Sequence, residues 1–351
     1  MSVAHTPPAD HAPLRWGIVS TGNIAGVFAK GLAESRSGQL VAVGSRSDDS
    51  AQSFAATWGV APAHAHGSLA GLLADAAVDA VYVATPHPMH CEAVVAALAA
   101  GKHVLCEKPL GMSLAEVASM HQAARTHQRT LMEAWMYRCH PQTERVAAMV
   151  RKGAVGELRH LQGTFSFNAP FAPAGRLWNR QLGGGGILDV GGYPLSYVRL
   201  LVGAAQGRPF ADPTELKAVG VLHPESGSDA QASALLRFAG DITAEVSCGT
   251  WVMQQNRVRI YGSEGWIEVP SPFVISPDGS PTSIGWQRAG EAEPEIITIT
   301  ADRSLYAYEA DAFALAVRAG SLEVPQCPWA DTRGNMAAQF EWCRQVGVDY
   351  A

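Results

Sequence analysis

The chain is predicted to form an α/β unit with a doubly wound parallel sheet, followed by an α+β unit with a large, open-faced, mainly antiparallel sheet. Between residues 14 and 133, short apolar runs alternate with helical segments, which is the pattern of parallel strands covered by helices on both faces. From about Leu216 the chain reads as alternating strands separated by glycine-rich turns, as in antiparallel sheets. The length of 351 residues also suits two domains better than one core.

The composition is that of a globular protein, with 47% hydrophobic and 17% charged residues. A formal net charge of −6 and the absence of any Lys/Arg run argue against nucleic acid as a partner. The sequence shows no apolar run near the roughly 18 residues that span a bilayer and no pattern of a secretory signal, so we expect a cytoplasmic protein without a membrane partner. Six scattered cysteines without C-x-x-C spacing predict reduced thiols.

A glycine-rich turn follows the first apolar strand, residues 14–20, and leads into a helix that reaches about Glu34. At a helix N-terminus, free backbone N–H groups and the helix dipole favour a phosphate. The turn matches the dinucleotide-binding fingerprint G-x-G-x-x-G/A, with serine in the first place, glycine in the second and alanine in the third. The residues expected to contact the cofactor here are Ser20, Gly22, Asn23 and Ile24.

The second strand, residues 40–44, ends at a Ser-Arg-Ser sequence. About 20 residues past the glycines, an acidic residue would accept a hydrogen bond from the ribose of NAD, whereas an arginine accommodates the 2′-phosphate of NADP. Arg46 lies 24 residues after Gly22, and Ser45 beside it can donate a hydrogen bond. We therefore predict NADP as the cofactor. The alternative is that Arg46 is an ordinary solvated loop residue.

A further strand, residues 103–106, runs into Glu107, Lys108 and Pro109. Proline keeps the residue before it out of the helical region, so Lys108 is expected to be extended at the carboxyl end of a strand. In open parallel sheets, ligands bind at that edge. Lys108 is thus a candidate site residue, and the alternative is a surface lysine in a strand-to-helix turn.

Histidines occur in two close pairs, His64 with His66 and His87 with His90, and such pairs can bind metals. No third ligand with convincing spacing accompanies either pair in the sequence. We therefore predict no metal site.

The segment after residue 133 concentrates Trp, Met, Tyr, Arg and His at a domain junction, which suggests a pocket wall that includes Arg138 and His140. Further on, four glycines at 183–186 open a helix and would allow a ligand to approach the backbone closely. Asp189 and Tyr193 are four residues apart and would share a helix face, with a kink or restart expected at Pro194. A lysine beside a tyrosine is an acid/base arrangement, because the cation lowers the phenol pKa.

Taken together, the turn at 20–25, the stretches 84–90 and 132–141, the Glu-Lys-Pro motif at 107–109 and the glycine-rich stretch at 184–193 resemble the Gfo/Idh/MocA oxidoreductase family over about residues 14–348. The resemblance implies that Lys108 is catalytic and lies beside the nicotinamide. Many members carry histidine where this chain has Tyr193. Tyrosine there is similar to the branch that contains glucose–fructose oxidoreductase, dimeric dihydrodiol dehydrogenase and NADP-dependent xylose dehydrogenase, in which it is the acid/base.

We therefore predict a flexible arm at 1–13, a dinucleotide-binding domain at 14–133, and a substrate-binding and oligomerisation domain at 134–351. We also expect the protein to form a homodimer or a homotetramer through the sheet of this last domain. The predicted catalytic residues are Lys108, Tyr193 and Asp189. Arg138 and His140, together with Asp189 and Tyr193, are expected to contact substrate. The predicted cofactor-binding residues are Ser20, Gly22, Asn23, Ile24, Ser45, Arg46, Thr85, His87, His90, Glu107, Lys108, Trp178 and Arg180.

The predicted activity is NADP(H)-dependent oxidation or reduction of a carbohydrate, with an aldose at C1 as the expected substrate. Two modes remain open: a retained cofactor that serves sugar–sugar (aldose–aldose) oxidoreduction, or a dissociating cofactor, as in an NADP-dependent xylose or glucose dehydrogenase. A trans-dihydrodiol dehydrogenase is a further enzymatic alternative. A non-catalytic NADP sensor is the alternative from another class, although it would not need both Lys108 and Tyr193.

Overall fold

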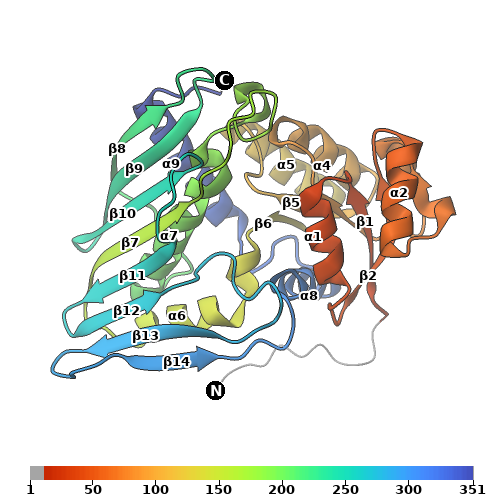
Figure 1. Cartoon of the computed structure of the whole chain (residues 1–351). Helices are drawn as coiled ribbons and strands as arrows, with labels where there is room; N and C mark the ends of the chain where they lie inside the picture. The colour runs from red at the N-terminus through yellow and green to blue at the C-terminus, as the bar shows by residue number, and fades with distance from the viewer. Residues whose placement is uncertain (1–11, 351) are drawn as a thin grey trace.

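The computed structural model describes residues 12–350, so the arm predicted at 1–13 lies almost wholly outside the described residues. The described chain forms two sheets, with helices between them and on the far side of the first sheet (Figure 1). The fold class predicted from the sequence is confirmed. The domain boundary after residue 133 remains a prediction.

The first sheet has six strands in the order β3-β2-β1-β4-β5-β6, and all its neighbours are parallel. This is the strand order of dinucleotide-binding folds, in which the ligand lies at the carboxyl ends where the order reverses, between β1 and β4. The strands are β1 (Leu14–Val19), β2 (Gly38–Gly44), β3 (Ala65–His66), β4 (Ala80–Val83), β5 (His103–Glu107) and β6 (Leu131–Ala134).

Helices cover both faces of this sheet and bury a separate apolar cluster on each. Phe28 of α1 stacks on Tyr82 of β4 on one face, whereas Val94 of α4 and Met120 of α5 belong to the other cluster. The double winding predicted from the alternation of strands and helices is therefore present. The helices are α1 (Asn23–Leu32), α2 (Asp48–Trp58), α3 (Leu69–Ala74), α4 (His90–Ala99) and α5 (Leu114–His127).

The second sheet has eight strands in the order β14-β13-β12-β11-β7-β10-β9-β8, and only the β7–β10 pair is parallel. Strand β7, the earliest in sequence, lies in the middle because β10 and β11 pair on its two sides. Strand β13, which carries a glycine and several polar residues, was not predicted. The strands are β7 (Leu158–Ser166), β8 (Glu215–Leu222), β9 (Asp229–Phe238), β10 (Ile242–Gly249), β11 (Arg257–Gly262), β12 (Gly265–Val269), β13 (Thr282–Arg288) and β14 (Glu295–Ile299).

One face of this sheet packs on α7 (Gly192–Ala205) and α9 (Trp329–Val346), with α6 (Pro141–Arg151) against α7 (Figure 1). The other face is open: β9 alternates buried and exposed residues along its length. Val219 and Leu235 on the open face are 74% and 62% exposed. Oligomerisation through this face stays a prediction.

After the second sheet the chain returns to the first one. Helix α8 (Leu305–Arg318) packs on α1, and Asp311 accepts hydrogen bonds from the hydroxyls of Ser35 and Ser37, at 2.6 and 2.5 Å. The indole N–H of Trp329, at the start of α9, donates to the backbone oxygen of Leu131 at 2.9 Å. The last quarter of the chain therefore contributes to the packing of both sheets.

None of the helices within residues 12–350 combines the length and the apolar character needed to cross a bilayer. All six cysteines are free thiols, and four of them are buried.

Candidate active site

A cavity of about 970 Å³ opens at the carboxyl ends of β1, β2, β4 and β5. It runs from the turn after β2 to the helix that carries Tyr193, so it joins the two parts of the chain. This is the edge of the sheet at which the sequence placed the site. The predicted residues that line it are Ser20, Gly22, Asn23, Ile24, Ser45, Arg46, Thr85, His87, Glu107, Lys108 and Tyr193.

Helix α1 begins at the cavity with its N-terminus free of side-chain caps from the described residues, and its first turn has no acidic residue. By contrast, Ser47, Ser68 and Ser113 cap α2, α3 and α5. Gly22 has an ordinary φ of −71°, and a Cβ placed there would meet only Ser20 Oγ at 3.8 Å. Neither the backbone nor the described packing explains glycine here, whereas an anion held against the helix N-terminus would.

Ser20, which stands in the first glycine place of the fingerprint, has a φ of 91°. Glycine adopts this conformation freely, and serine does so at a cost in strain. The Ser20 hydroxyl accepts a hydrogen bond from the backbone N–H of Gly22 at 3.4 Å, which supports the turn. Ala25 in the third glycine place is fully buried, as a small residue at the helix–sheet contact should be.

The end of the cavity beyond β2 is polar and carries a cation. Ser45 Oγ lies 3.4 Å from Thr21 Oγ, and Arg46 is exposed beside it. Within residues 12–350, no hydrogen bond or ion pair engages the Arg46 guanidinium. Arg46 is thus available to a ligand phosphate.

The inner end of the cavity is organised around Lys108. Its Nζ donates a hydrogen bond to the backbone oxygen of Asp189 at 2.7 Å and lies 3.5 Å from the Asp189 carboxylate. Arg176 donates from Nη1 to the same carboxylate oxygen at 2.8 Å and also lines the cavity. Two cations therefore converge on one buried carboxylate. Burial alone would raise the pKa of Asp189, but the charges of Lys108 and Arg176 hold it well below its usual range.

Tyr193 is 5% exposed and is packed among aromatic rings, with Trp135 edge-on at 4.8 Å and Phe165 at 5.1 Å between ring centroids. Its hydroxyl lies 3.5 Å from Met136 Sδ, a weak partner, and Lys108 Nζ lies 5.2 Å from the ring centroid. The structure therefore brings Lys108 and Tyr193 together, which the sequence could not show.

The predicted lowering of the Tyr193 pKa is not found in this structure. Burial raises the pKa of Tyr193 well above its usual value, and the nearby groups of Tyr306 and Glu107 raise it further. The reason is that Lys108 directs its ammonium to Asp189 rather than to the phenolic oxygen. In this arrangement Tyr193 is a neutral phenol.

The four glycines at 183–186 face protein rather than the cavity, which corrects the expectation that they admit a ligand. A Cβ at Gly185 would come within 2.1 Å of Asp229 Oδ1, and one at Gly186 within 3.1 Å of Gly249 Cα. Asp229 in turn accepts a hydrogen bond from the Ile187 N–H at 2.6 Å. The glycines thus let a buried aspartate anchor the start of the helix that carries the site.

That helix begins as a π-helical segment, Ile187–Gly191, and continues as α7 from Gly192. The change of helix type just before Pro194 is the restart that was predicted. Asp189 lies in the first segment and Tyr193 in the second. Tyr193 lines the cavity, whereas Asp189, which was predicted to contact substrate, is not among the lining residues and contacts Lys108 and Arg176 instead.

Two residues predicted to contact substrate lie elsewhere. The Arg138 guanidinium is buried and pairs with Asp331 at 2.6 Å, and it also donates to Ser196. His140 is the N-cap of α6, where its ring accepts the Gln142 N–H at 3.1 Å. Both side chains have structural partners and do not line the cavity.

Three predicted cofactor ligands also lie off the cavity. His90 is fully buried, with its ring nitrogens 2.9 Å from the backbone oxygens of Thr85 and Pro109, so it joins the two loops that do line it. Trp178 is buried and donates to the Pro170 oxygen at 3.0 Å, and Arg180 donates to a backbone oxygen near the C-terminus. Arg176, rather than Arg180, lines the cavity. Arg176 was not among the site residues predicted from the sequence.

Comparison with known proteins identifies this architecture. Residues 14–135 match the profile described as "Oxidoreductase family, NAD-binding Rossmann fold", and residues 143–268 match the "GFO/IDH/MocA C-terminal domain". The chain belongs to the Gfo/Idh/MocA oxidoreductase family. The resemblance read from its motifs is thus confirmed.

Among similar family members is the trans-1,2-dihydrobenzene-1,2-diol dehydrogenase of Mus musculus, 33% identical over 96% of this chain and 98% of that protein. A crystal structure of a 3-ketoreductase from Actinomadura kijaniata, in complex with NADP and TDP-benzene, superposes with a TM-score of 0.83 at 27% identity, covering 95% of this chain and 98% of that one. An aldose–aldose oxidoreductase from Caulobacter crescentus shares the fold, with a TM-score of 0.84 at 24% identity over 95% of this chain and 98% of that one.

Asp229→Asn should remove part of the pH dependence of stability. Burial raises the pKa of Asp229 to about 7, whereas an unfolded aspartate titrates at about 3.9. Between these two pH values the folded protein therefore binds one proton more than the unfolded chain. The contribution of this proton to the free energy of unfolding is fully present below about pH 4 and is lost as the pH rises to about 7. At about 1.4 kcal/mol per pKa unit, the loss is at most about 4 kcal/mol.

The measurement is urea unfolding of both proteins at pH 5 and pH 8. Asparagine keeps an oxygen for the Ile187 N–H and cannot ionise, so the difference between the two pH values should shrink in the variant. Burial also raises the pKa of Glu133 to about 7. Glu133 is present in both proteins, so its contribution to the pH dependence cancels in the comparison. Equal pH dependence in the two proteins would show that Asp229 does not carry this effect.

Proposed function

We propose that the protein is an NADP(H)-dependent oxidoreductase that interconverts a hydroxyl and a carbonyl group of a carbohydrate, with an aldose oxidised at C1 as the expected substrate. The observation that carries the proposal is one cavity with two ends. The N-terminus of α1 and Arg46 form one end, and Lys108, Arg176 and Tyr193 form the other, with Asp189 behind them as the ion-pair partner of Lys108 and Arg176.

The described residues fit NADP. The N-terminus of α1 suits the pyrophosphate, and Arg46 with Ser45 suits the 2′-phosphate. Two buried polar atoms that line the cavity, Thr85 Oγ1 and His87 Nδ1, have no partner among the described residues, as expected where a ligand supplies one. The 3-ketoreductase that resembles this chain was crystallised with NADP.

In the proposed mechanism, bound NADP(H) supplies the acceptor or donor of hydride at its nicotinamide. Tyr193 holds or releases the proton of the reacting hydroxyl at its phenolic oxygen, whose one hydrogen-bond partner within residues 12–350 is the sulfur of Met136. Lys108, fixed by Asp189, places a positive charge where negative charge develops on oxygen. Asp189 orients Lys108, and Arg176, which lines the cavity, orients the substrate hydroxyls.

The raised pKa of Tyr193 bears on the direction of the reaction. A neutral phenol is ready to donate a proton to a forming alkoxide, so carbonyl reduction needs no prior ionisation. Oxidation needs the phenolate, which Lys108 favours if its ammonium turns from Asp189 toward the phenolic oxygen.

A trans-dihydrodiol is the second candidate substrate. Dehydrogenases of this type are relatives at 33% identity. The non-catalytic NADP sensor is disfavoured by Lys108 beside Tyr193. It would gain support if the protein bound NADP and turned over neither sugars nor dihydrodiols.

Arg46→Ala should weaken NADP binding by about 10- to 100-fold and leave NAD binding nearly unchanged. The reason is the loss of a charge-assisted hydrogen bond to the 2′-phosphate, worth about 1.5–3 kcal/mol. Titration calorimetry with each cofactor measures both effects. Arg159→Ala, at an exposed arginine of the second sheet, is the matched control. An equal loss for the two cofactors would rule out this role for Arg46.

Tyr193→Phe should lower kcat by about 10²- to 10⁴-fold while NADP binding stays intact. Phenylalanine keeps the ring and its aromatic packing and removes only the hydroxyl. Tyr197→Phe is the control, since Tyr197 is a buried tyrosine one helical turn further on that does not line the cavity. Retention of more than about a tenth of the wild-type kcat would contradict the acid/base assignment.

An absorbance spectrum of freshly purified protein, taken before and after addition of excess glucose or xylose, separates the two modes of cofactor use. If NADP is retained, a band at about 340 nm grows with sugar alone, because the nicotinamide is reduced in place. Sugar–sugar oxidoreduction would then be the favoured mode of cofactor use. A spectrum that changes only after NADP is supplied would indicate an ordinary dehydrogenase.

A further inference from the structure

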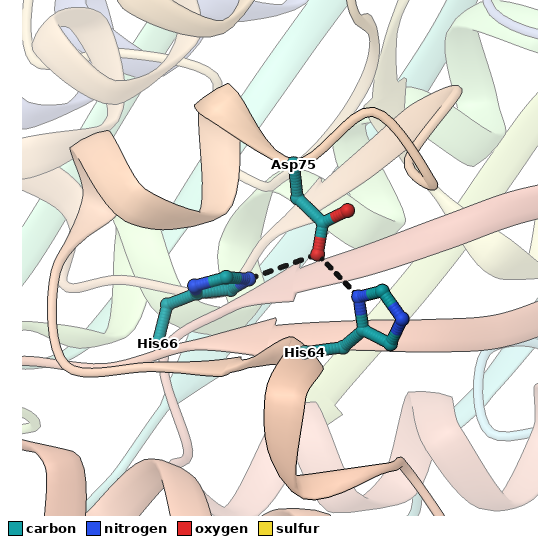
Figure 2. Close-up of side chains that lie close together, drawn as sticks. All are labelled: His64, His66 and Asp75. Atoms are coloured by element: carbon teal, nitrogen blue, oxygen red, sulfur yellow. Dashed lines mark hydrogen bonds and ion pairs between the residues drawn. The ribbon is translucent and has the colours of Figure 1, made fainter.

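Three side chains of metal-ligand type meet at the edge of the first sheet, apart from the cavity. His64 ends the short 3₁₀ turn Pro62–His64, His66 lies in β3, and Asp75 follows α3. Figure 2 shows both imidazole rings pointing to the same carboxylate oxygen of Asp75. His64 Nδ1 lies 2.7 Å and His66 Nε2 2.9 Å from Asp75 Oδ2, and the three ligand atoms all lie within 4.8 Å of one another.

Two neighbouring groups hold Asp75 in this orientation. Its other oxygen accepts the Ala77 N–H at 2.8 Å, and Lys102 Nζ donates to the Asp75 backbone oxygen at 2.9 Å. The Asp75 side chain is 7% exposed, while those of His64 and His66 are 38% and 22% exposed. A buried carboxylate thus faces two imidazoles that solvent can reach.

A carboxylate oxygen accepts hydrogen bonds, so each ring nitrogen that faces Asp75 Oδ2 carries a proton. A divalent ion would take the place of these two protons.

We propose that His64, His66 and Asp75 form a site for a divalent transition-metal ion of the zinc class. Two imidazole nitrogens and one carboxylate oxygen are a donor set that such ions accept, with water completing the coordination on the exposed side. Around tetrahedral zinc, ligand atoms are about 3.3 Å apart, so the two distances from the histidine nitrogens to Asp75 Oδ2 have to lengthen by about half an ångström. The partly exposed imidazole rings leave room for this adjustment.

The ion would be structural rather than catalytic. None of the three residues lines the cavity within the described chain. His66 is paired with Gly44 of β2, and its backbone oxygen accepts the Ser45 N–H at 2.9 Å. Metal binding would therefore tie α3 to the edge strand directly behind the turn that carries Arg46.

The test uses untagged, full-length protein that has been treated with a chelator, and zinc alone as the probe. Calorimetry, and metal analysis after gel filtration, should give one ion per chain for the wild type. His64→Gln/His66→Gln should lower the affinity by more than about 100-fold, because it leaves one of three ligands. The glutamine amides can still donate to Asp75, so the hydrogen-bonded arrangement is kept. His127→Gln/His160→Gln is the matched control and should bind as the wild type does.

Cobalt serves as a second probe. Bound at this site, it should show visible ligand-field bands without the near-ultraviolet band of thiolate ligation. NADP affinity of the double variant should equal that of the wild type, which shows that the fold is intact. If the double variant does not fold, Asp75→Asn replaces it. No retained zinc in the wild type, equal zinc binding in the variant, or a thiolate spectrum would each overturn the proposal.

Discussion

The hydrogen bond from Lys108 to the backbone oxygen of Asp189 is the contact on which the site depends. Lys108 follows β5 of the first sheet, and Asp189 lies in the π-helical segment that leads into α7, which packs on the second sheet. The contact therefore fixes the carboxyl edge of the first sheet relative to the helix that carries Tyr193. It depends in turn on a buried carboxylate, which persists as an anion because Arg176 supplies a second positive charge.

The position of Asp189 depends on further packing interactions that the sequence motifs do not reveal. Asp229 on β9 accepts a hydrogen bond from the Ile187 N–H at the start of the helix, and the glycines at 185 and 186 allow it to approach. The Gly-rich stretch is thus needed for packing between the helix and the second sheet. Its link to function is indirect: it sets where Asp189 and Tyr193 lie.

The fold and one end of the site could be read from the sequence because their signals are local. Strand–helix alternation, the turn at Gly22 and the arginine after β2 each lie within a short segment with a known geometry. The other features depend on contacts between distant segments. The periodicity of the sequence does not show whether Arg176 or Arg180 lines the cavity. It also does not show that Arg138 forms an ion pair with Asp331, or that Asp75 lies beside His64 and His66 on the other side of α3. The Tyr193 pKa was mispredicted for the same reason, since burial is set by packing.

The return of the chain to the first sheet has a consequence for engineering. The ring of Phe313 on α8 lies 5.1 Å from that of Trp16 on β1, and Asp311 holds the loop before β2. A fragment that ends near residue 133 would leave Trp16 and Phe28 open to water on one face. The nucleotide-binding half is therefore not a transplantable module. A chimaera that exchanges it with a relative's needs to carry α8 and the start of α9 from the same parent.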